Sequence, residues 1–146
     1  MEKGVSGGNE KEDGIDMSPQ SEFLDLICTT AENNCNLDTK ISTKELPPEG
    51  GIYAELGEGF GDGQYYSKEA SEKTIPVLFL CRNISQERCL DQLADICNYL
   101  SGLKEYPNGQ HVAWLNTVTA KEPNKIGRDE DGKYYYSAIV NCLVYF

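Results

Sequence analysis

Ala113-Trp-Leu-Asn-Thr-Val-Thr-Ala120 and Tyr134-Tyr-Tyr-Ser-Ala-Ile-Val-Asn-Cys-Leu-Val-Tyr-Phe146 are the stretches that decide the fold, and residues 121–133 between them form a polar linker. Every second residue in each run is predominantly apolar. These residues are Val112, just before the first run, then Trp114, Asn116, Val118 and Ala120, and in the second run Tyr134, Tyr136, Ala138, Val140, Cys142, Val144 and Phe146. Alternation at period two is typical of strands with one buried face. The pattern predicts a long C-terminal β-hairpin, and its linker is long enough to protrude as an arm.

The strongest helix signal precedes this hairpin, at residues 85–101. Ser85 is a good N-cap, an apolar stripe at helical spacing follows, and Gly102 stands just beyond its end. The stripe contains Cys89, Leu93, Ile96, Cys97 and Leu100, whereas Arg88, Asp91, Gln92, Asp95 and Asn98 form a face that we expect to be exposed to solvent. A first helix is predicted at residues 18–32, where Ser18-Pro19 supplies a cap and Asn33-Asn34 an end.

Short strands are expected between the helices, at residues 51–56 and, more weakly, 64–67. Thr74-Ile-Pro-Val-Leu-Phe-Leu-Cys-Arg82 is a continuous apolar run, which predicts a strand buried on both faces, with Pro76 near its start. Residues 1–14 lack periodic apolar positions and are expected to form a disordered tail. The rest, 15–146, predicts one α+β domain in which an antiparallel or mixed sheet carries a helix on one face.

The chain has 146 residues and a formal charge of −11, with the acidic excess in residues 1–103. Such a surface repels phosphate and anionic lipid, so we expect neither specific nucleic-acid binding nor membrane attachment. No signal peptide or apolar run of eighteen residues is present, which indicates synthesis in the cytoplasm. Four of the six cysteines, Cys81, Cys89, Cys97 and Cys142, occupy apolar positions, so free thiols are favoured over disulfides.

No motif in the sequence supports an enzyme, a cofactor or a metal site. Residues 57–63 alternate glycine with other residues but match neither the dinucleotide-binding nor the P-loop pattern, so a flexible loop is the better interpretation. The fragment Asp129-Glu-Asp-Gly132 lacks the remaining calcium ligands, and Asp131-Gly132 is a favoured hairpin turn. His111, the single histidine, has no nucleophile pattern around it.

The tyrosines leave two interpretations open. Tyr134, Tyr135 and Tyr136 place rings on both faces of one strand, and Tyr145 does so again beside Phe146. One face is expected under helix 85–101. The other is either a half-exposed surface, or this face or the edge of the strand is covered by a neighbouring subunit.

The order of elements in residues 75–146 resembles that of the tail-terminator and minor capsid proteins of long-tailed bacteriophages and their prophages. The likeness comprises the apolar strand Ile75–Cys81, a helix opening near Ser85, the run Trp114-Leu-Asn-Thr-Val-Thr, a loop with Pro123, Ile126-Gly127-Arg128-Asp129 and Gly132, and a final tyrosine-rich strand. It covers about half of the chain.

This resemblance implies an α+β virion protein without catalysis or cofactor. Members form rings, commonly of six subunits, at the head-proximal end of the tail tube, where they stop tube polymerisation and contact the neck. The implied partners are further copies of the chain, tail-tube proteins and neck proteins, and the implied location is the virion after synthesis in the bacterial host. For the subunit interface we expect Trp114, Arg128, Asp129, Tyr134, Tyr135, Tyr136 and Tyr145. The alternative is a monomeric module that binds a protein or ligand through its tyrosine-rich sheet face.

Overall fold

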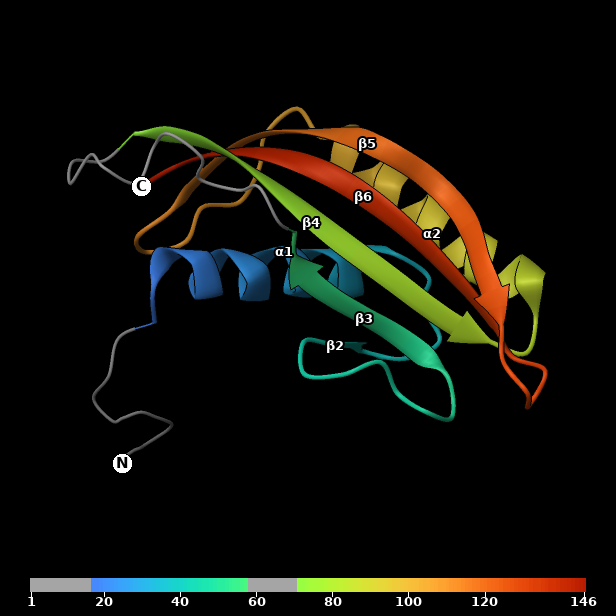
Figure 1. Cartoon of the computed structure of the whole chain (residues 1–146). Coiled ribbons are helices and arrows are strands. Elements are labelled where there is room, and N and C mark those ends of the chain that lie inside the picture. Colours follow the sequence, from blue (N-terminus) through green and yellow to red (C-terminus); the bar gives the residue numbers. More distant parts are fainter. Residues whose placement is uncertain (1–16, 58–70) are drawn as a thin grey trace.

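A computed structural model describes residues 17–57 and 71–146 as two helices and one five-stranded sheet (Figure 1). In chain order the elements are α1 (Pro19–Asn34), β2 (Ile41–Ser42), β3 (Gly51–Leu56), β4 (Glu72–Asn83), α2 (Gln86–Ser101), β5 (Ala113–Arg128) and β6 (Tyr134–Tyr145). The fold is α+β, as the sequence predicts. The tail predicted at 1–14, the strand predicted at 64–67 and nearly all of the glycine-rich run at 57–63 lie outside the described residues.

The sheet is mixed and has the strand order β2-β3-β4-β6-β5. β2 and β3 are parallel, and all other neighbouring strands are antiparallel. The predicted C-terminal hairpin is confirmed, because β5 pairs with β6 from Ala113 opposite Tyr145 to Arg128 opposite Tyr134. β4 is the central strand of the sheet and lies between β3 and β6.

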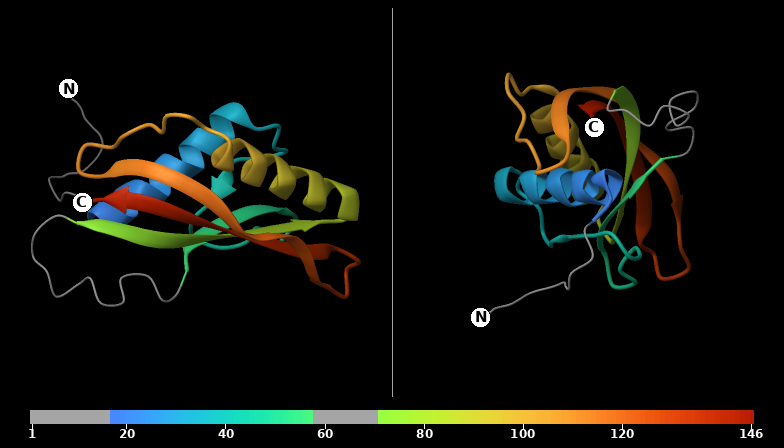
Figure 2. Two further views of the ribbon diagram at one scale, coloured as in Figure 1. Left: turned by 90° about the horizontal axis from the view of Figure 1, so that it is seen from above. Right: turned by 90° about the vertical axis from the view of Figure 1, so that its left-hand side faces the viewer.

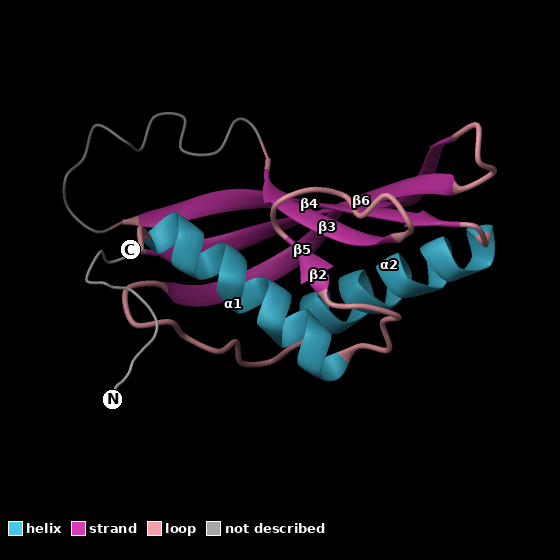
Figure 3. Cartoon of the chain, turned by 90° about the horizontal axis from the view of Figure 1, so that it is seen from below, coloured by secondary structure: helices cyan, strands magenta, loops and turns pink. Residues whose placement is uncertain are grey.

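Both helices lie on the same side of the sheet, which leaves the molecule with two layers (Figures 2 and 3). α2 packs across β4, β5 and β6, and α1 packs against α2 and β3. The core between the layers includes Phe23 and Ile27 from α1, Leu93 and Ile96 from α2, and Phe79 from β4, all fully buried. The prediction that helix 85–101 covers one face of the sheet is confirmed.

The two helices begin where the sequence places their caps. The hydroxyl of Ser18 accepts a hydrogen bond from the Ser21 N–H, and that of Ser85 accepts one from the Arg88 N–H. α1 continues two residues beyond the predicted end, to Asn34, whose side-chain amide donates to the Thr30 carbonyl. That hydrogen bond satisfies one of the carbonyls that a helix end leaves open.

One face of α2 was expected to be solvated, and for Gln92 this prediction is wrong. Gln92 is only 1% exposed, and its side-chain oxygen accepts a hydrogen bond from the Asp38 N–H at 2.8 Å. Nearby, the Asp95 carboxylate accepts from the Asn36 N–H. The connection from α1 to β2 therefore lies over this face, and the polar side chains of α2 satisfy its backbone.

The prediction that β4 is buried on both faces is also wrong. Ile75, Val77, Phe79 and Cys81 face the helices and are fully buried, but the alternate residues are exposed or half-buried. Pro76 lies inside the strand rather than near its start, which is Glu72. The proline is tolerated because β3 ends opposite it, where the Pro76 carbonyl accepts from the Gly57 N–H and no ladder donor is needed.

Bulges in β5 overturn the simple alternation predicted for residues 112–120. Pairing with β6 shifts register between Trp114 and Asn116, so Trp114 and Thr117 both face the helices. Thr117 is only 1% exposed, whereas Val118 is 52% exposed. A bulge adds one residue and so reverses the parity beyond it. The alternation predicted for the second run is confirmed, since Tyr136, Ala138, Val140, Cys142 and Val144 are buried on the helix side.

Most of the segment predicted as a linker, residues 121–133, is strand. β5 continues to Arg128, and the turn occupies only residues 129–133. Residues 121–128 were predicted to be a loop because they are polar and include Pro123. However, β5 is the edge strand, where polar side chains and proline are tolerated. The arm is thus a paired hairpin end rather than a free loop.

Candidate assembly surface

The turn of the hairpin is closed by Asp129 and Gly132. The Asp129 N–H donates to the Lys133 carbonyl at 2.9 Å, and the Gly132 N–H donates to the Asp129 carbonyl. One Asp129 carboxylate oxygen accepts the Lys133 N–H, and Gly132 has a φ of 85°, in the region that favours glycine. The predicted turn at Asp131-Gly132 is therefore present, and the Asp129 carboxylate is part of it.

Arg82, at the end of β4, holds the hairpin end in place. Its guanidinium is paired with Asp129 and lies 5.2 Å from the centre of the Tyr135 ring. The Tyr135 hydroxyl donates to the same carboxylate at 3.3 Å. Desolvation is the largest influence on the pKa of Asp129 and raises it, but hydrogen bonds from Lys133 and Arg82 together hold that pKa below its usual value. The cluster ties the turn to the centre of the sheet.

Lys125, Ile126, Arg128 and Tyr134 form what we call the hairpin tip. The Lys125 ammonium lies 5.0 Å and the Arg128 guanidinium 5.1 Å from the centre of the Tyr134 ring. Pairing shifts register between Lys125 and Gly127, and Ile126 at this bulge is 57% exposed. The tip therefore presents an aliphatic side chain between two cations.

The opposite side of the sheet from the helices, which we call the open face, is covered by no helix or strand within residues 17–57 and 71–146 (Figure 2). Register and burial place a mainly apolar group there: Pro76, Leu78 and Leu80 of β4, Ile139 and Leu143 of β6, and Val118 of β5. Thr74, Asn116, Val118, Asn141 and Leu143 line a shallow hollow of about 240 Å³. Apolar side chains gathered on a sheet face in this way are typical of contact surfaces.

Two exposed carboxylates border this apolar group, Glu55 on β3 and Glu72 on β4. Glu55 pairs opposite Leu78, and Glu72 shares the parity of Thr74 and Leu78. A hydrogen bond with Glu55 is the largest cause of a raised pKa for Tyr53, which places the Tyr53 hydroxyl against that carboxylate. The β3 and β4 side of the open face is thus acidic.

The structure divides the seven residues predicted for a subunit interface into three groups. Arg128, Asp129, Tyr134 and Tyr135 gather at the hairpin end, and Tyr145, 45% exposed, lies at the other end of β6. Trp114 and Tyr136 are buried. Trp114 is 2% exposed and lies 5.2 Å from Phe23 and 4.8 Å from Tyr106 between ring centres, and the Tyr136 hydroxyl donates to Gln86 of α2. We therefore remove Trp114 and Tyr136 from the candidate surface.

Arg82, Lys125 and Ile126 were missed by the sequence analysis. The sequence indicates a role for Arg82, because this cation directly follows the apolar run of β4 and needs a partner there. It indicates none for Lys125 and Ile126, since only the bulge and the register of β5 place them beside Arg128 and Tyr134.

The outer edge of β5 is poorly suited to continuous pairing with another strand. Its ladder with β6 shifts register four times, and Pro123 interrupts the donors available along it. Bulges and proline are common means of protecting an edge strand. The hairpin tip and the open face are therefore better contact candidates than the edge.

His111 is engaged in a structural contact. Its ring Nδ1 lies 3.0 Å from one Glu22 carboxylate oxygen, and the backbone N–H of His111 donates to the other. Desolvation is the largest influence on the pKa of Glu22 and raises it, but the His111 hydrogen bonds and charge together lower that pKa below its usual value. Glycine at position 109 leaves room for this pair, because a Cβ there would displace the Glu22 carboxylate. The pair joins α1 to the loop before β5.

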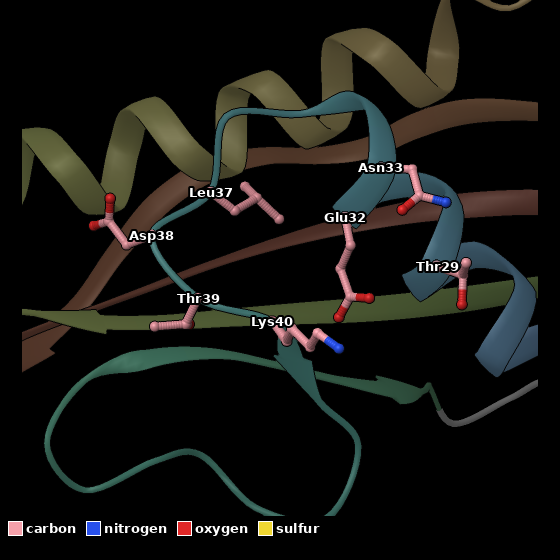
Figure 4. Close-up of a pocket in the computed structure, with 7 residues that line it drawn as sticks. All are labelled: Thr29, Glu32, Asn33, Leu37, Asp38, Thr39 and Lys40. Atoms are coloured by element: carbon pink, nitrogen blue, oxygen red, sulfur yellow. The ribbon is translucent and has the colours of Figure 1, made fainter.

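A hollow of about 650 Å³ lies between the end of α1 and β2 (Figure 4). Its carboxylates are already used: Glu32 accepts from the Ile41 N–H at 2.6 Å, and Asp38 pairs with Arg88 at 2.6 Å. Within residues 17–57 and 71–146 no three His, Cys, Asp or Glu side chains are grouped to hold a metal ion. The hollow is therefore a polar depression whose two carboxylates hold neighbouring parts of the fold.

All six cysteines are free thiols, as the sequence favours. Burial, the main cause, raises the pKa of Cys28 and Cys142 to about 12. Such thiols are poor nucleophiles at neutral pH.

Comparison with known proteins gives no family assignment. No protein-family model matches the chain, and no curated protein is similar to it in sequence. None of the helices in the described part of the chain is both long and apolar enough to span a membrane.

Proposed function

We propose that this chain is a structural protein of a long-tailed bacteriophage or prophage, resembling a tail terminator or minor capsid protein. In this proposal several copies form a ring at the head-proximal end of the tail tube and join the tail to the neck. The chain acts by contact and performs no catalysis. It is made in the cytoplasm of the bacterial host and ends in the virion.

The observation that supports this best is the open face beside a long hairpin. Leu78, Leu80, Ile139 and Leu143 are more apolar than a solvated sheet face requires, and no described element covers them. An antiparallel sheet with one solvated face normally alternates apolar and polar residues. The resemblance adds its element order, apolar strand, helix and tyrosine-rich hairpin, which is also the order of β4, α2, β5 and β6.

A second candidate is a monomeric module that binds a protein or ligand through the same face. It is favoured by Tyr53 and Tyr135, which lie on the open face at half-buried positions. Tyrosine contributes strongly to many binding surfaces because it combines an apolar ring with a hydroxyl.

Electron microscopy of negatively stained samples separates the two candidates. We expect rings from concentrated protein, or rings at one end of purified phage tail tubes. Tubes grown in the presence of the chain should also be shorter than tubes grown alone. Only monomers in solution, combined with unoccupied tube ends at high protein concentration, would reject the virion proposal and leave the monomeric module.

A further inference from the structure

We propose that the hairpin tip of one copy binds the open face of a second copy. The inference rests on the proposed function in so far as that function requires contacts between copies. It goes further by naming the two surfaces and the chemistry that joins them.

The apolar part of the contact is provided by Ile126 and the hollow of the open face. Ile126 stands at a bulge and is 57% exposed, so a partner that covers it removes apolar surface from water. The hollow of about 240 Å³ is lined by the apolar Val118 and Leu143 and by the polar Thr74, Asn116 and Asn141, so it offers apolar surface to part of such a side chain. Leu78, Leu80 and Ile139 extend the apolar surface beside it.

Charge gives the contact its direction. Each copy carries −11, so two copies approaching in an arbitrary orientation repel one another. The tip carries two cations, Lys125 and Arg128, next to the exposed Glu130 and Asp131 of the turn. The open face is bordered by the carboxylates of Glu55 and Glu72 on its β3 and β4 side and by Lys121 on its β5 side. Docking that brings these two cations to the β3 and β4 side of the face sets opposite charges against each other there.

The two surfaces are different parts of the molecule. The tip lies at the far end of the β5–β6 hairpin, and the open face extends along the sheet on the side away from the helices (Figures 1 and 2). A contact between unlike surfaces leaves each copy with one used and one unused surface, so it repeats and closes into a ring where the rotation permits. Copies joined in this way can form a ring, and the protected edge of β5 need not pair with another strand.

A charge exchange tests the contact. The tip variant carries Lys125→Glu and Arg128→Glu, and the face variant carries Glu55→Lys and Glu72→Lys. Each variant alone brings like charges together, so we expect association to weaken about tenfold or more in sedimentation velocity at 50 mM salt. In an equimolar mixture every contact again joins opposite charges, and association should return. Recovery in the mixture is specific to a tip-to-face contact, because loss of folding in either variant cannot produce it.

Matched controls change charge elsewhere. Lys104→Glu and Glu105→Lys lie in the exposed loop after α2 and should associate like the wild type. Ile126→Asp should weaken association without changing the melting temperature by more than a few degrees, since its side chain is mostly solvated in one copy. Any one of three results would overturn the contact. The wild type could fail to associate both in solution and on tubes, the two charge variants could associate like the wild type, or their mixture could fail to recover association.

The outcome separates this inference from the proposed function. Capping of tubes by both the wild type and the tip variant would keep the virion role and reject the contact. Tip-to-face association without any binding to tail tubes would keep the contact and reject the virion role.

Discussion

Replacing Thr117 with valine removes a buried hydrogen bond that exists because β5 is bulged, together with the weaker donation of the same hydroxyl to the Cys142 sulfur at 3.6 Å. The indole N–H of Trp114 donates to the Thr117 hydroxyl at 2.7 Å, and both residues are almost completely buried. Valine keeps the volume of threonine but offers no acceptor, and water cannot reach the site. The unsatisfied indole N–H should therefore cost about 1 to 3 kcal/mol of unfolding free energy.

Urea unfolding followed by far-UV circular dichroism measures this loss. With a slope of about 2 kcal/mol per molar urea for a domain of this size, a loss of about 2 kcal/mol lowers the midpoint by roughly 1 M. Trp114 is the single tryptophan of the chain, so its fluorescence reports the same transition from inside the core. Thr43→Val, at an exposed position after β2, is the matched control and should change stability by less than about 0.5 kcal/mol.

A double-mutant cycle with Trp114→Phe decides whether the hydrogen bond is the cause. Phenylalanine has no donor, so in that background Thr117→Val should cost less than in the wild type, by about 0.5 to 3 kcal/mol. An unchanged midpoint for Thr117→Val, or equal losses in both backgrounds, would show that Thr117 does not face Trp114 in the core. The bulge between Trp114 and Asn116 would then be refuted.

Three further predictions concern single sites. The pKa of Glu22 is lowered in the folded state, so its carboxylate stabilises the fold above its unfolded pKa of about 4.3, and this contribution is lost as pH falls through the lowered value. Glu22→Gln should therefore flatten the decline of the urea midpoint in that pH range. An unchanged decline would contradict the His111 pairing. Gly132→Ala should cost about 1 to 2 kcal/mol in thermal melts because φ is 85° there, and full stability would exclude this turn geometry. Cys28 and Cys142 should resist a thiol reagent at pH 8 until the protein is unfolded, since burial raises their pKa to about 12; rapid labelling of both in the native protein would contradict their burial.

Elements with strong local signals were predicted well from the sequence. α2 begins after its Ser85 cap, and β3 occupies the residues expected, 51–56. The apolar stripe of α2 and the alternation of β6 both face the core as predicted. In each case neighbouring residues alone carry the information, because capping and periodicity depend on local geometry.

The errors lie where tertiary contacts override local pattern. Gln92 is buried by a connection that begins almost sixty residues earlier in the chain, and no periodicity on α2 reports it. The end of β5 reads as a linker, since an edge strand needs no apolar outer side. The hairpin tip could be predicted only in part: Arg128 and Tyr134 stood out as residues, but Ile126 and Lys125 join them only through register.

The bulges of β5 link the fold to the proposed contact surface. Without a register shift, Val118 would face the helices with Trp114, and Thr117 would face outward, as the plain alternation predicts. The structure does the reverse: Thr117 enters the core, where its hydroxyl requires a partner, and apolar Val118 is added to the open face. For an isolated fold this exchange is unfavourable, because it buries a polar group and exposes an apolar one. Departures from local preference concentrate where function demands them, so the exchange favours a use for the apolar open face beyond the stability of a single copy.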